Sequence, residues 1–254
     1  MYDAYLGGKD NYRADREAVR QILRQWPEVR QIARANRAFL QRAVRFLASE
    51  AGIRQFIDIG TGIPSAGNVH EVAGQIAPDA RVVYVDNDPI VHVHANALFT
   101  GSGTTSIILA DVREPQAILA DPALRAVVDF DQPVGLLLIA ILHFIADAEE
   151  PAGIVAALRD ALPRGSYLAL SHATGDFHPP GTEDEAAAAY QNAAAPLALR
   201  THSQISTYFD GFDLLEPGLV QAPLWRPEGR KPRPGDLAKI GIYAGVSRKT
   251  DTSA

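Results

Sequence analysis

The stretch that decides the fold reads FIDIGTGIPSAG and covers residues 56–67. It begins with a short apolar run, which is followed by two glycines one residue apart and then by Pro64. Gly60 and Gly62 allow a tight turn and the close approach of a ligand to the backbone, because neither has a Cβ. Pro64 has a fixed φ that suits the first turn of a helix. The stretch therefore predicts a strand, a ligand-binding turn and a helix in succession.

Apolar runs alternate with helical patterns around this stretch. A helix is expected over residues 31–51, because its apolar residues lie largely on one side and Gly52 follows as a stop. Strands are expected at residues 55–59, 81–85, 105–110, 134–142 and 166–171. Short, nearly continuous apolar strands separated by helices indicate parallel strands that are covered on both faces. The predicted fold class is therefore α/β, with a three-layer, Rossmann-like arrangement.

The last third of the chain breaks this alternation. Helices are expected at residues 182–196 and 203–209, and final strands at 212–215 and 240–246. Residues 225–236 are rich in proline, glycine and basic residues, which is typical of a surface loop. No linker is visible, so we expect a single domain. Its parts would be an N-terminal lid with helices (1–52), a cofactor-binding core (53–173), a helical cap (174–210) and final strands (211–248).

The composition narrows the classes of function. The chain has 254 residues and no cysteine, which excludes disulfides, thiolate zinc sites and a cysteine nucleophile. No motif typical of a metal site is present. A formal net charge of −6 argues against binding to nucleic acids or to anionic membranes. No apolar run approaches the roughly 20 residues that span a bilayer, and no secretion signal is visible, so we expect a cytoplasmic protein.

Carboxylates are expected at the ends of three successive strands, where doubly wound sheets bind their ligands. Asp86 ends the second strand, 24 residues after Gly62, and is placed to bind ribose hydroxyls. Asp111 follows the third strand, where the exocyclic amine of adenine would be its partner. Asp58, two residues before Gly60, would repel a pyrophosphate but attract the ammonium group of a methionine moiety. The pattern therefore favours S-adenosylmethionine over NAD.

Further motifs are spread over nearly the whole chain. They are YLGGKDNY at 5–12, DR at 15–16, NRAF at 36–39, the loop at 58–71, VDNDP at 85–89, LHF at 142–144, GSYL at 165–168 and SHA at 171–173. Together they resemble the S-adenosyl methyltransferase family of high-GC Gram-positive bacteria, long catalogued as a domain of unknown function. The resemblance extends from Tyr2 to about Val246.

This resemblance implies the class I methyltransferase fold, a mostly parallel seven-stranded sheet with an antiparallel last strand, here with an N-terminal helical extension. It also implies S-adenosylmethionine as the cofactor. We expect the cofactor-binding residues in the core to be Asp58, Gly60, Thr61, Gly62, Asp86, Asn87, Asp111, Val112 and Ala140. An N-terminal lid would add Tyr5, Gly7, Gly8 and Lys9.

Two histidines are candidate catalytic residues. Methyl transfer needs an aligned nucleophile and, for many acceptors, a base that removes its proton. His143 follows the fourth strand and is similar in place to the base of small-molecule O-methyltransferases, although a histidine there can also serve packing alone. His172 follows the fifth strand and would either line the acceptor pocket or bond to the loop backbone.

The sequence thus predicts a methyltransferase acting on a small molecule, with an oxygen acceptor and His143 as the base. One alternative is a regulator that binds S-adenosylmethionine or S-adenosylhomocysteine without transferring a methyl group. A less favoured alternative is an NAD-dependent oxidoreductase.

Overall fold

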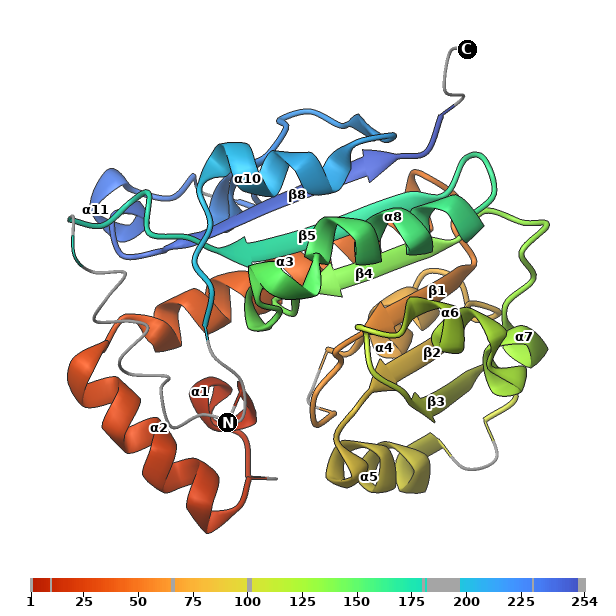
Figure 1. Ribbon diagram of the computed structural model, residues 1–254, viewed down its shortest axis with the longest axis horizontal. Coiled ribbons are helices and arrows are strands. Elements are labelled where there is room, and N and C mark those ends of the chain that lie inside the picture. Colours follow the sequence, from red (N-terminus) through yellow and green to blue (C-terminus); the bar gives the residue numbers. More distant parts are fainter. Residues whose placement is uncertain are drawn as a thin grey trace.

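A mixed β-sheet runs through the centre of the molecule and carries helices on both faces (Figure 1). The computed structural model describes residues 2–9, 11–64, 67–99, 102–179, 181, 197–229 and 231–250. The strands in these parts are β1 (Gln55–Ile59), β2 (Arg81–Asp86), β3 (Thr105–Leu109), β4 (Gly135–Ile139), β5 (Tyr167–Ala173), β6 (Asp213–Leu214), β7 (Val220–Gln221) and β8 (Ile242–Arg248). Their order in the sheet is β3-β2-β1-β4-β5-β8-β6, and β7 also pairs with β8.

The sheet changes direction after β5. Strands β1 to β5 are parallel, whereas β8 runs antiparallel to β5. The two-residue strands β6 and β7 pair with different parts of β8, so both lie beside it at the same edge. The predicted parallel sheet with an antiparallel last strand is confirmed. The sequence analysis did not predict β7, so the described sheet has eight strands and not the seven expected.

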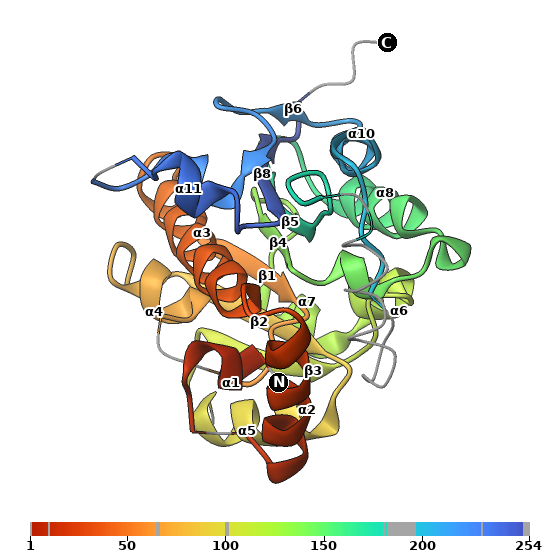
Figure 2. The ribbon, with the colours of Figure 1, turned by 90° about the vertical axis from the view of Figure 1, so that its left-hand side faces the viewer.

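The helices form two layers. They are α1 (Tyr2–Leu6), α2 (Arg13–Gln25), α3 (Val29–Ser49), α4 (Val69–Gly74), α5 (Pro89–Phe99), α6 (Pro115–Ala120), α7 (Pro122–Val127), α8 (Pro151–Ala161), α10 (His202–Ser206) and α11 (Pro234–Leu237), with short 3₁₀ turns η1 (Leu142–Phe144), η2 (Asp147–Glu149), η3 (Thr207–Phe209) and η4 (Ala222–Leu224). Figure 2 shows α3 and α4 on one side of the sheet and α6 and α8 on the other. Alternate strand residues point to these two sides and fill two hydrophobic cores.

Helix α3 is the longest of the described helices and is central to the first core. Its buried residues recur at helical spacing and include Phe39, Val44 and Leu47, which are fully buried. The ring of Phe39 packs edge-on against Trp225, 5.4 Å away between centroids. Trp225 is itself fully buried, which corrects the expectation of a surface loop from residue 225 onward. An aromatic side chain at the end of a polar segment can fold back into the core, and local composition does not reveal this.

The predicted and observed elements differ mainly at their ends. The strand expected at 134–142 ends at Ile139, because Ala140 adopts a left-handed conformation with a φ of 57° and η1 follows. The residues directly after it, Ala140 to Leu142, are also apolar, so hydrophobicity alone could not mark the boundary. The helix expected at 203–209 is confirmed as α10 followed by η3. The helix expected at 182–196 lies outside the described residues.

Within the residues that the structure describes, no helix is long and apolar enough to cross a membrane.

Candidate active site

The glycine turn after β1 leaves its backbone open on one side. Gly60 and Gly62 have φ values of 76° and 65°, a region that favours glycine. A Cβ on Gly60 would lie 2.6 Å from Cδ1 of Ile141, whereas a Cβ on Gly62 would meet nothing within 4 Å. The N–H of Gly60 donates to the carbonyl of Val85 at 2.8 Å and fixes the turn to β2. The turn is therefore fixed at Gly60 by the hydrogen bond to Val85 and by packing against Ile141, whereas Gly62 faces open space.

Asp86, the last residue of β2, organises this turn. Its Oδ2 accepts a hydrogen bond from the N–H of Gly62 at 2.8 Å, and its Oδ1 accepts one from the N–H of Asp88 at 3.0 Å. Burial raises the pKa of the Asp86 carboxyl, and the bonds from these N–H groups oppose that effect. The structure thus brings Asp86 to the glycine turn, as the sequence predicted.

Asp58 lies in β1 beside the same turn and is only 4% exposed. Burial raises the pKa of its carboxyl to about 7, and the nearby Asp86 adds to this rise. The positive charge of Arg37 and a hydrogen bond with the side chain of Thr61 act in the opposite direction. A carboxyl with this raised pKa holds its proton more tightly than an exposed one, and a cationic group brought next to it would favour the ionised form.

Arg37 is a site residue that the sequence analysis did not identify. It extends from α3, and its Nη2 donates to Oδ1 of Asn68 at 2.7 Å, just before α4. The NRAF motif at 36–39 marked this position, but no local rule assigned it a role. The fold places the guanidinium group near Asp58, so this end of β1 carries one basic and one acidic group.

Asp111 completes the row of carboxylates. It accepts hydrogen bonds from Nδ2 of Asn87 at 2.9 Å and from Nη1 of Arg113 at 3.1 Å. Arg113 also pairs with Glu149 through Nε, at 2.9 Å. The neighbouring Val112 is buried. The structure therefore connects the ends of β2 and β3 to the turn after β4, and about a quarter of the Asp111 side chain (27%) remains exposed.

The N-terminal residues form a closed turn. Tyr5 is buried and belongs to the core with α3, so it is not an open wall of the site. The N–H of Gly8 donates to the carbonyl of Asp3 at 2.9 Å, and a Cβ on Gly8 would overlap the Asp3 carboxylate. Gly7 has a φ of 86°, and Lys9 is exposed. The glycine pair thus serves the turn itself, and only Lys9 of these expected lid residues projects outward.

The end of β4 carries the second group of expected residues. The N–H of Ala140 donates to the carbonyl and to the hydroxyl of Ser171, at 3.2 and 3.0 Å. His143, in η1, is buried, and its Nδ1 accepts a hydrogen bond from the N–H of Ala173 at 3.3 Å. Burial lowers the pKa of His143 well below its usual value. The ring is therefore neutral, and the tautomer compatible with this contact carries its hydrogen on Nε2.

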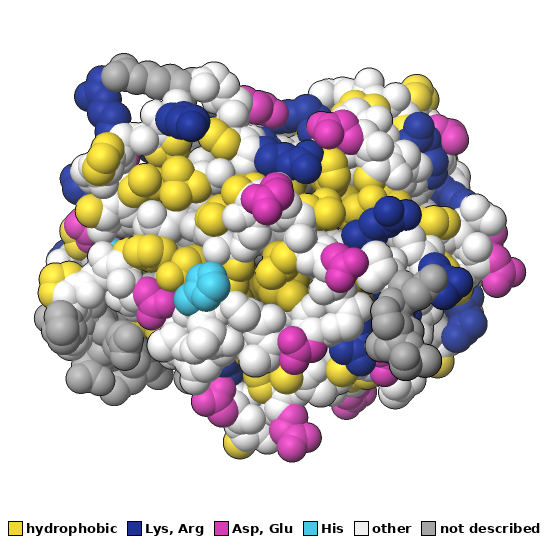
Figure 3. Space-filling view, turned by 90° about the horizontal axis from the view of Figure 1, so that it is seen from above, with side chains coloured by type: hydrophobic (Ala, Val, Ile, Leu, Met, Phe, Trp, Pro, Cys, Tyr) yellow, Lys and Arg dark blue, Asp and Glu magenta, His cyan; other side chains and the backbone are white. Residues whose placement is uncertain are grey.

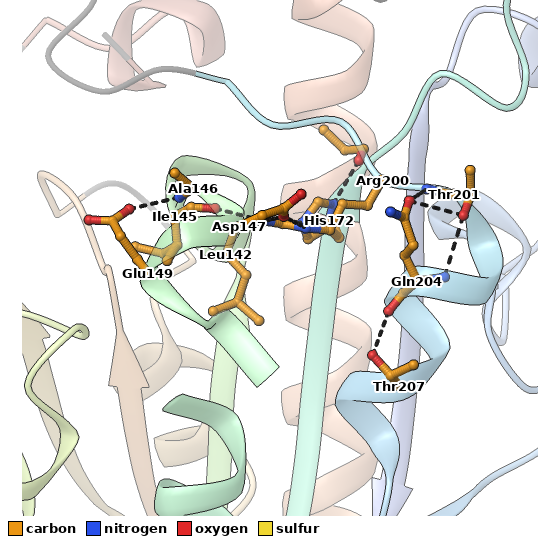
Figure 4. A network of polar contacts seen from close by, with 11 residues as sticks. Leu142, Ile145, Ala146, Asp147, Glu149, His172, Arg200, Thr201, Gln204 and Thr207 are labelled. Carbon is orange, nitrogen blue, oxygen red and sulfur yellow. Dashed lines mark hydrogen bonds and ion pairs between the residues drawn. The ribbon is translucent and has the colours of Figure 1, made fainter. Parts of the chain in front are cut away.

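Arg200 holds this second group together from inside the protein (Figure 4). Its Nη1 donates to the carbonyl of Leu142 at 3.0 Å and lies 2.9 Å from Nε2 of His172. Its Nη2 donates to the carbonyl of Ile145 at 2.8 Å and to Oδ1 of Asp147 at 2.6 Å. The sequence analysis missed Arg200, because its partners lie 28 to 58 residues away and form no local pattern.

His172 differs from the sequence expectation of a catalytic role. It is fully buried, its Nδ1 lies 2.7 Å from the carbonyl of Ala173, and its Nε2 faces Arg200. Burial lowers the pKa of His172 to about 3, and the charge of Arg200 contributes in the same direction. Both ring nitrogens are occupied, so His172 has none free to take a proton from a substrate. Its contacts instead join β5 to Arg200, which in turn bonds to the loop after β4.

Nearly the whole chain matches one methyltransferase family. The family model described as S-adenosyl methyltransferase matches residues 1–250. A DUF574 family protein from Streptomyces avermitilis is 45% identical, with a TM-score of 0.92 over 98% of this chain and 95% of that one. A candidate methyltransferase from Thermobifida fusca is 40% identical, with a TM-score of 0.91 over 98% and 93%.

A more distant structure shares the fold alone. The N-methyltransferase NodS from Bradyrhizobium japonicum, solved with S-adenosylhomocysteine, is 13% identical, with a TM-score of 0.53 over 93% of this chain and 98% of that one. The comparison with curated proteins gives no match.

Proposed function

Because the chain belongs to the S-adenosyl methyltransferase family, we propose that its cofactor lies at the ends of β1, β2 and β3 and that its acceptor is a small molecule. The chain is an S-adenosylmethionine-dependent methyltransferase. The observation that carries the site assignment is the row of carboxylates, Asp58, Asp86 and Asp111, around an open glycine turn. When bound, S-adenosylmethionine supplies an activated methyl group on a sulfonium centre.

The nucleoside part of the cofactor fits the ends of β2 and β3. Asp86 already accepts two backbone N–H groups, and its carboxylate oxygens have further lone pairs for ribose hydroxyls. In our proposal Asn87, Asp111 and Val112 surround the adenine. Gly60, Thr61 and Gly62 support the ribose and the methionine chain, because a turn without Cβ atoms lets a ligand approach its backbone. Ala140 would face the cofactor from the end of β4.

The amino-acid part of the cofactor fits the other end of the turn. Its ammonium group would pair with Asp58, whose ionised form such a cation favours. Its carboxylate would pair with Arg37, since a guanidinium group matches a carboxylate in both charge and geometry. The nearness of these two opposite charges supports a zwitterionic ligand and opposes a pyrophosphate.

The N-terminal segment closes this site in our proposal. Tyr12 follows the N-terminal turn that contains Gly7 and Gly8. Its hydroxyl lies 3.4 Å from Nε2 of His94 in α5. Helix α5 begins three residues after Asp86. The contact therefore connects the N-terminal segment to the helix beside the proposed nucleoside site, and Lys9 would provide a polar contact from the same segment. Opening and closing of this segment would admit and retain the cofactor.

The acceptor would be held beside His143 at the ends of β4 and β5. A small acceptor agrees with the surface, because acidic and basic side chains are interspersed on the face seen in Figure 3 rather than gathered by sign. We retain oxygen as the acceptor atom. The contact with Ala173 leaves the hydrogen of His143 on Nε2. We therefore propose that this N–H aligns the acceptor oxygen and that the proton lost from the acceptor hydroxyl passes to water and not to the ring.

Calorimetric titration tests the cofactor site with three ligands. We expect S-adenosylhomocysteine to bind, NAD not to bind, and 5′-methylthioadenosine, which lacks the amino-acid part, to bind more weakly. Arg37→Met should weaken S-adenosylhomocysteine about thirtyfold, as expected for a lost charge-assisted hydrogen bond, and leave 5′-methylthioadenosine unchanged. Arg34→Met is the matched control, because Arg34 is an exposed arginine on the same helix.

Two results would contradict the proposal. Binding of NAD without S-adenosylhomocysteine would remove the cofactor assignment altogether. Equal losses for both nucleosides in Arg37→Met would remove only the role of Arg37.

A further inference from the structure

A chain of hydrogen bonds inside the protein connects helix α1 to the turn after β4. The Ala140 N–H donates to the Ser171 hydroxyl at 3.0 Å, and this hydroxyl donates to Oδ1 of Asn36 at 2.6 Å. Nδ2 of Asn36 then donates to the Tyr2 hydroxyl at 2.9 Å, which donates to the Ala33 carbonyl at 3.1 Å. Each hydroxyl accepts one hydrogen bond and donates one, so every hydrogen bond in this series has a fixed donor and a fixed acceptor.

Asn36 is the central member of this chain. It is 2% exposed, and Ser171, to which it is bonded, lies 135 residues away in β5. Oδ1 of Asn36 accepts the hydrogen bond that the Ser171 hydroxyl donates. The lone pairs of that hydroxyl therefore face the Ala140 N–H. An apolar side chain at position 36 would free the Ser171 hydroxyl to rotate, and the Ala140 N–H would keep only the Ser171 carbonyl, at 3.2 Å, as a directed acceptor.

Ala140 depends on such an acceptor because of its backbone. It has a φ of 57°, a left-handed conformation that is costly for a residue with a Cβ and that persists when its surroundings hold it. The next residue, Ile141, packs against Gly60 of the glycine turn, and η1 with His143 follows directly. The conformation of Ala140 therefore decides how the end of β4 meets the glycine turn.

We propose that Asn36 is a positioning residue: acting through Ser171, it holds the Ala140 turn in the conformation that the cofactor needs. The inference rests on the proposed function, because it assumes that the cofactor binds against this turn. It gives the buried asparagine of the NRAF motif a role that the described contacts explain. Asn36 would not touch the cofactor itself, and its effect would pass through the hydroxyl of Ser171.

Asn36→Leu tests this role with a matched control elsewhere in the fold. Gln55 is also a buried amide, 1% exposed, and its side chain makes three hydrogen bonds, with Asp129 and Gln132, at the opposite end of β1. Gln55→Leu should therefore lower the melting temperature about as much as Asn36→Leu. Only Asn36→Leu should weaken S-adenosylhomocysteine, by about tenfold in the dissociation constant. Hydrogen exchange of the Ala140 amide, without ligand, should become about tenfold faster in Asn36→Leu alone.

The outcomes separate the two proposals. If the wild-type chain does not bind S-adenosylhomocysteine, the proposed function fails and this inference fails with it. If the wild type binds and Asn36→Leu binds within twofold of it, only the role of Asn36 is wrong. Should Asn36→Leu not fold, Ser171→Ala replaces it, because that change removes one hydroxyl from the same chain. Unchanged affinity and unchanged Ala140 exchange in Ser171→Ala would equally overturn the inference.

Discussion

The ends of β1 to β3 and the ends of β4 and β5 lie side by side, but they are built differently. In the first region, Asp86 and Asp111 accept hydrogen bonds from groups 2 or 24 residues away, and carboxylate oxygens keep lone pairs for a ligand. In the second, Arg200 reaches partners 28 to 58 residues away, and both ring nitrogens of His172 are occupied. The first region therefore keeps hydrogen-bond acceptors for a ligand, whereas the polar groups of the second region bond to one another and stabilise its conformation.

Burial shifts side-chain pKa values in opposite directions in the two regions. It raises the pKa of the Asp58 carboxyl to about 7 and lowers the pKa of the His172 ring to about 3. Both shifts favour the neutral form of the side chain. The two side chains differ in what can change this. A cationic ligand can restore the charge of Asp58, whereas Nε2 of His172 is already bonded to Arg200, which keeps the ring neutral. Ligand binding should therefore change the protonation of the first region only.

The largest expected effect comes from loosening the second region. Arg200→Met removes a buried guanidinium group and leaves the carbonyls of Leu142 and Ile145 and the ring of His172 without their donor. We expect a loss of about 3 kcal/mol in the free energy of unfolding, which lowers the melting temperature by roughly 9 °C. The affinity for S-adenosylhomocysteine should change little, and calorimetry on the same samples checks both quantities. A stability equal to that of the wild type would show that Arg200 does not fasten this region.

A smaller effect, on ligand affinity, is expected from removing a carboxylate of the first region. Asp86→Ala removes the carboxylate that orders Gly62 and that would bind the ribose, so the S-adenosylhomocysteine dissociation constant should rise about thirtyfold. Asp88→Ala is the control, since Asp88 is exposed and bonds only to the start of α5 through its side chain, at the N–H of Ile90. Equal affinities of the two variants would place the ribose elsewhere.

The pH dependence of binding distinguishes the two regions further. With a pKa of about 7 in the empty site, about one Asp58 carboxyl in eleven is ionised at pH 6 and about ten in eleven at pH 8. The affinity for S-adenosylhomocysteine should therefore rise about tenfold between these pH values. Asp58→Asn should bind weakly and show no such rise. A wild-type affinity that is constant from pH 6 to 8 would rule out the pairing with the ammonium group.

The same carboxyl affects the stability of the unliganded protein. Its pKa is raised from 3.8, so the folded state keeps a proton that the unfolded state has lost between these two values. The contribution of Asp58 to stability is therefore present at low pH and is lost as the pH rises toward 7. Asp58→Asn should make the stability fall less steeply over this range, as measured by urea unfolding at several pH values.

The smallest effect on stability is expected from changing Arg113, which lies at the surface between the two regions. Arg113 pairs with Asp111 and Glu149, and its side chain is 39% exposed. Exposed ion pairs contribute little, so Arg113→Met should change the free energy of unfolding by less than about 0.5 kcal/mol. A loss as large as that of Arg200→Met would mean that this bridge stabilises the loop after β4 as strongly as Arg200 does.

The sequence by itself determined the parallel sheet, the glycine turn and the three carboxylates at its edge. Short apolar runs, closely spaced glycines and an acidic residue at a strand end are local features, and the rules of strand and turn geometry apply to them directly. The bounds of β1 agree with the prediction, and Asp86 and Asp111 lie at the ends of β2 and β3 as expected. The positions of these acidic residues and of the turn could therefore be predicted, whereas Arg37, which reaches the same region from α3, could not.

Only the tertiary structure decided the contacts of Asn36, Arg200 and His172 and the burial of Trp225. Each depends on partners brought together by packing from distant parts of the chain, such as the 135 residues between Asn36 and Ser171. A histidine with a free nitrogen and one bonded on both sides look the same in a sequence. The two regions of the site therefore differ in predictability for one physical reason: the first is held mainly by the backbone close to its own strand ends, the second by side chains that meet only once the sheet has formed.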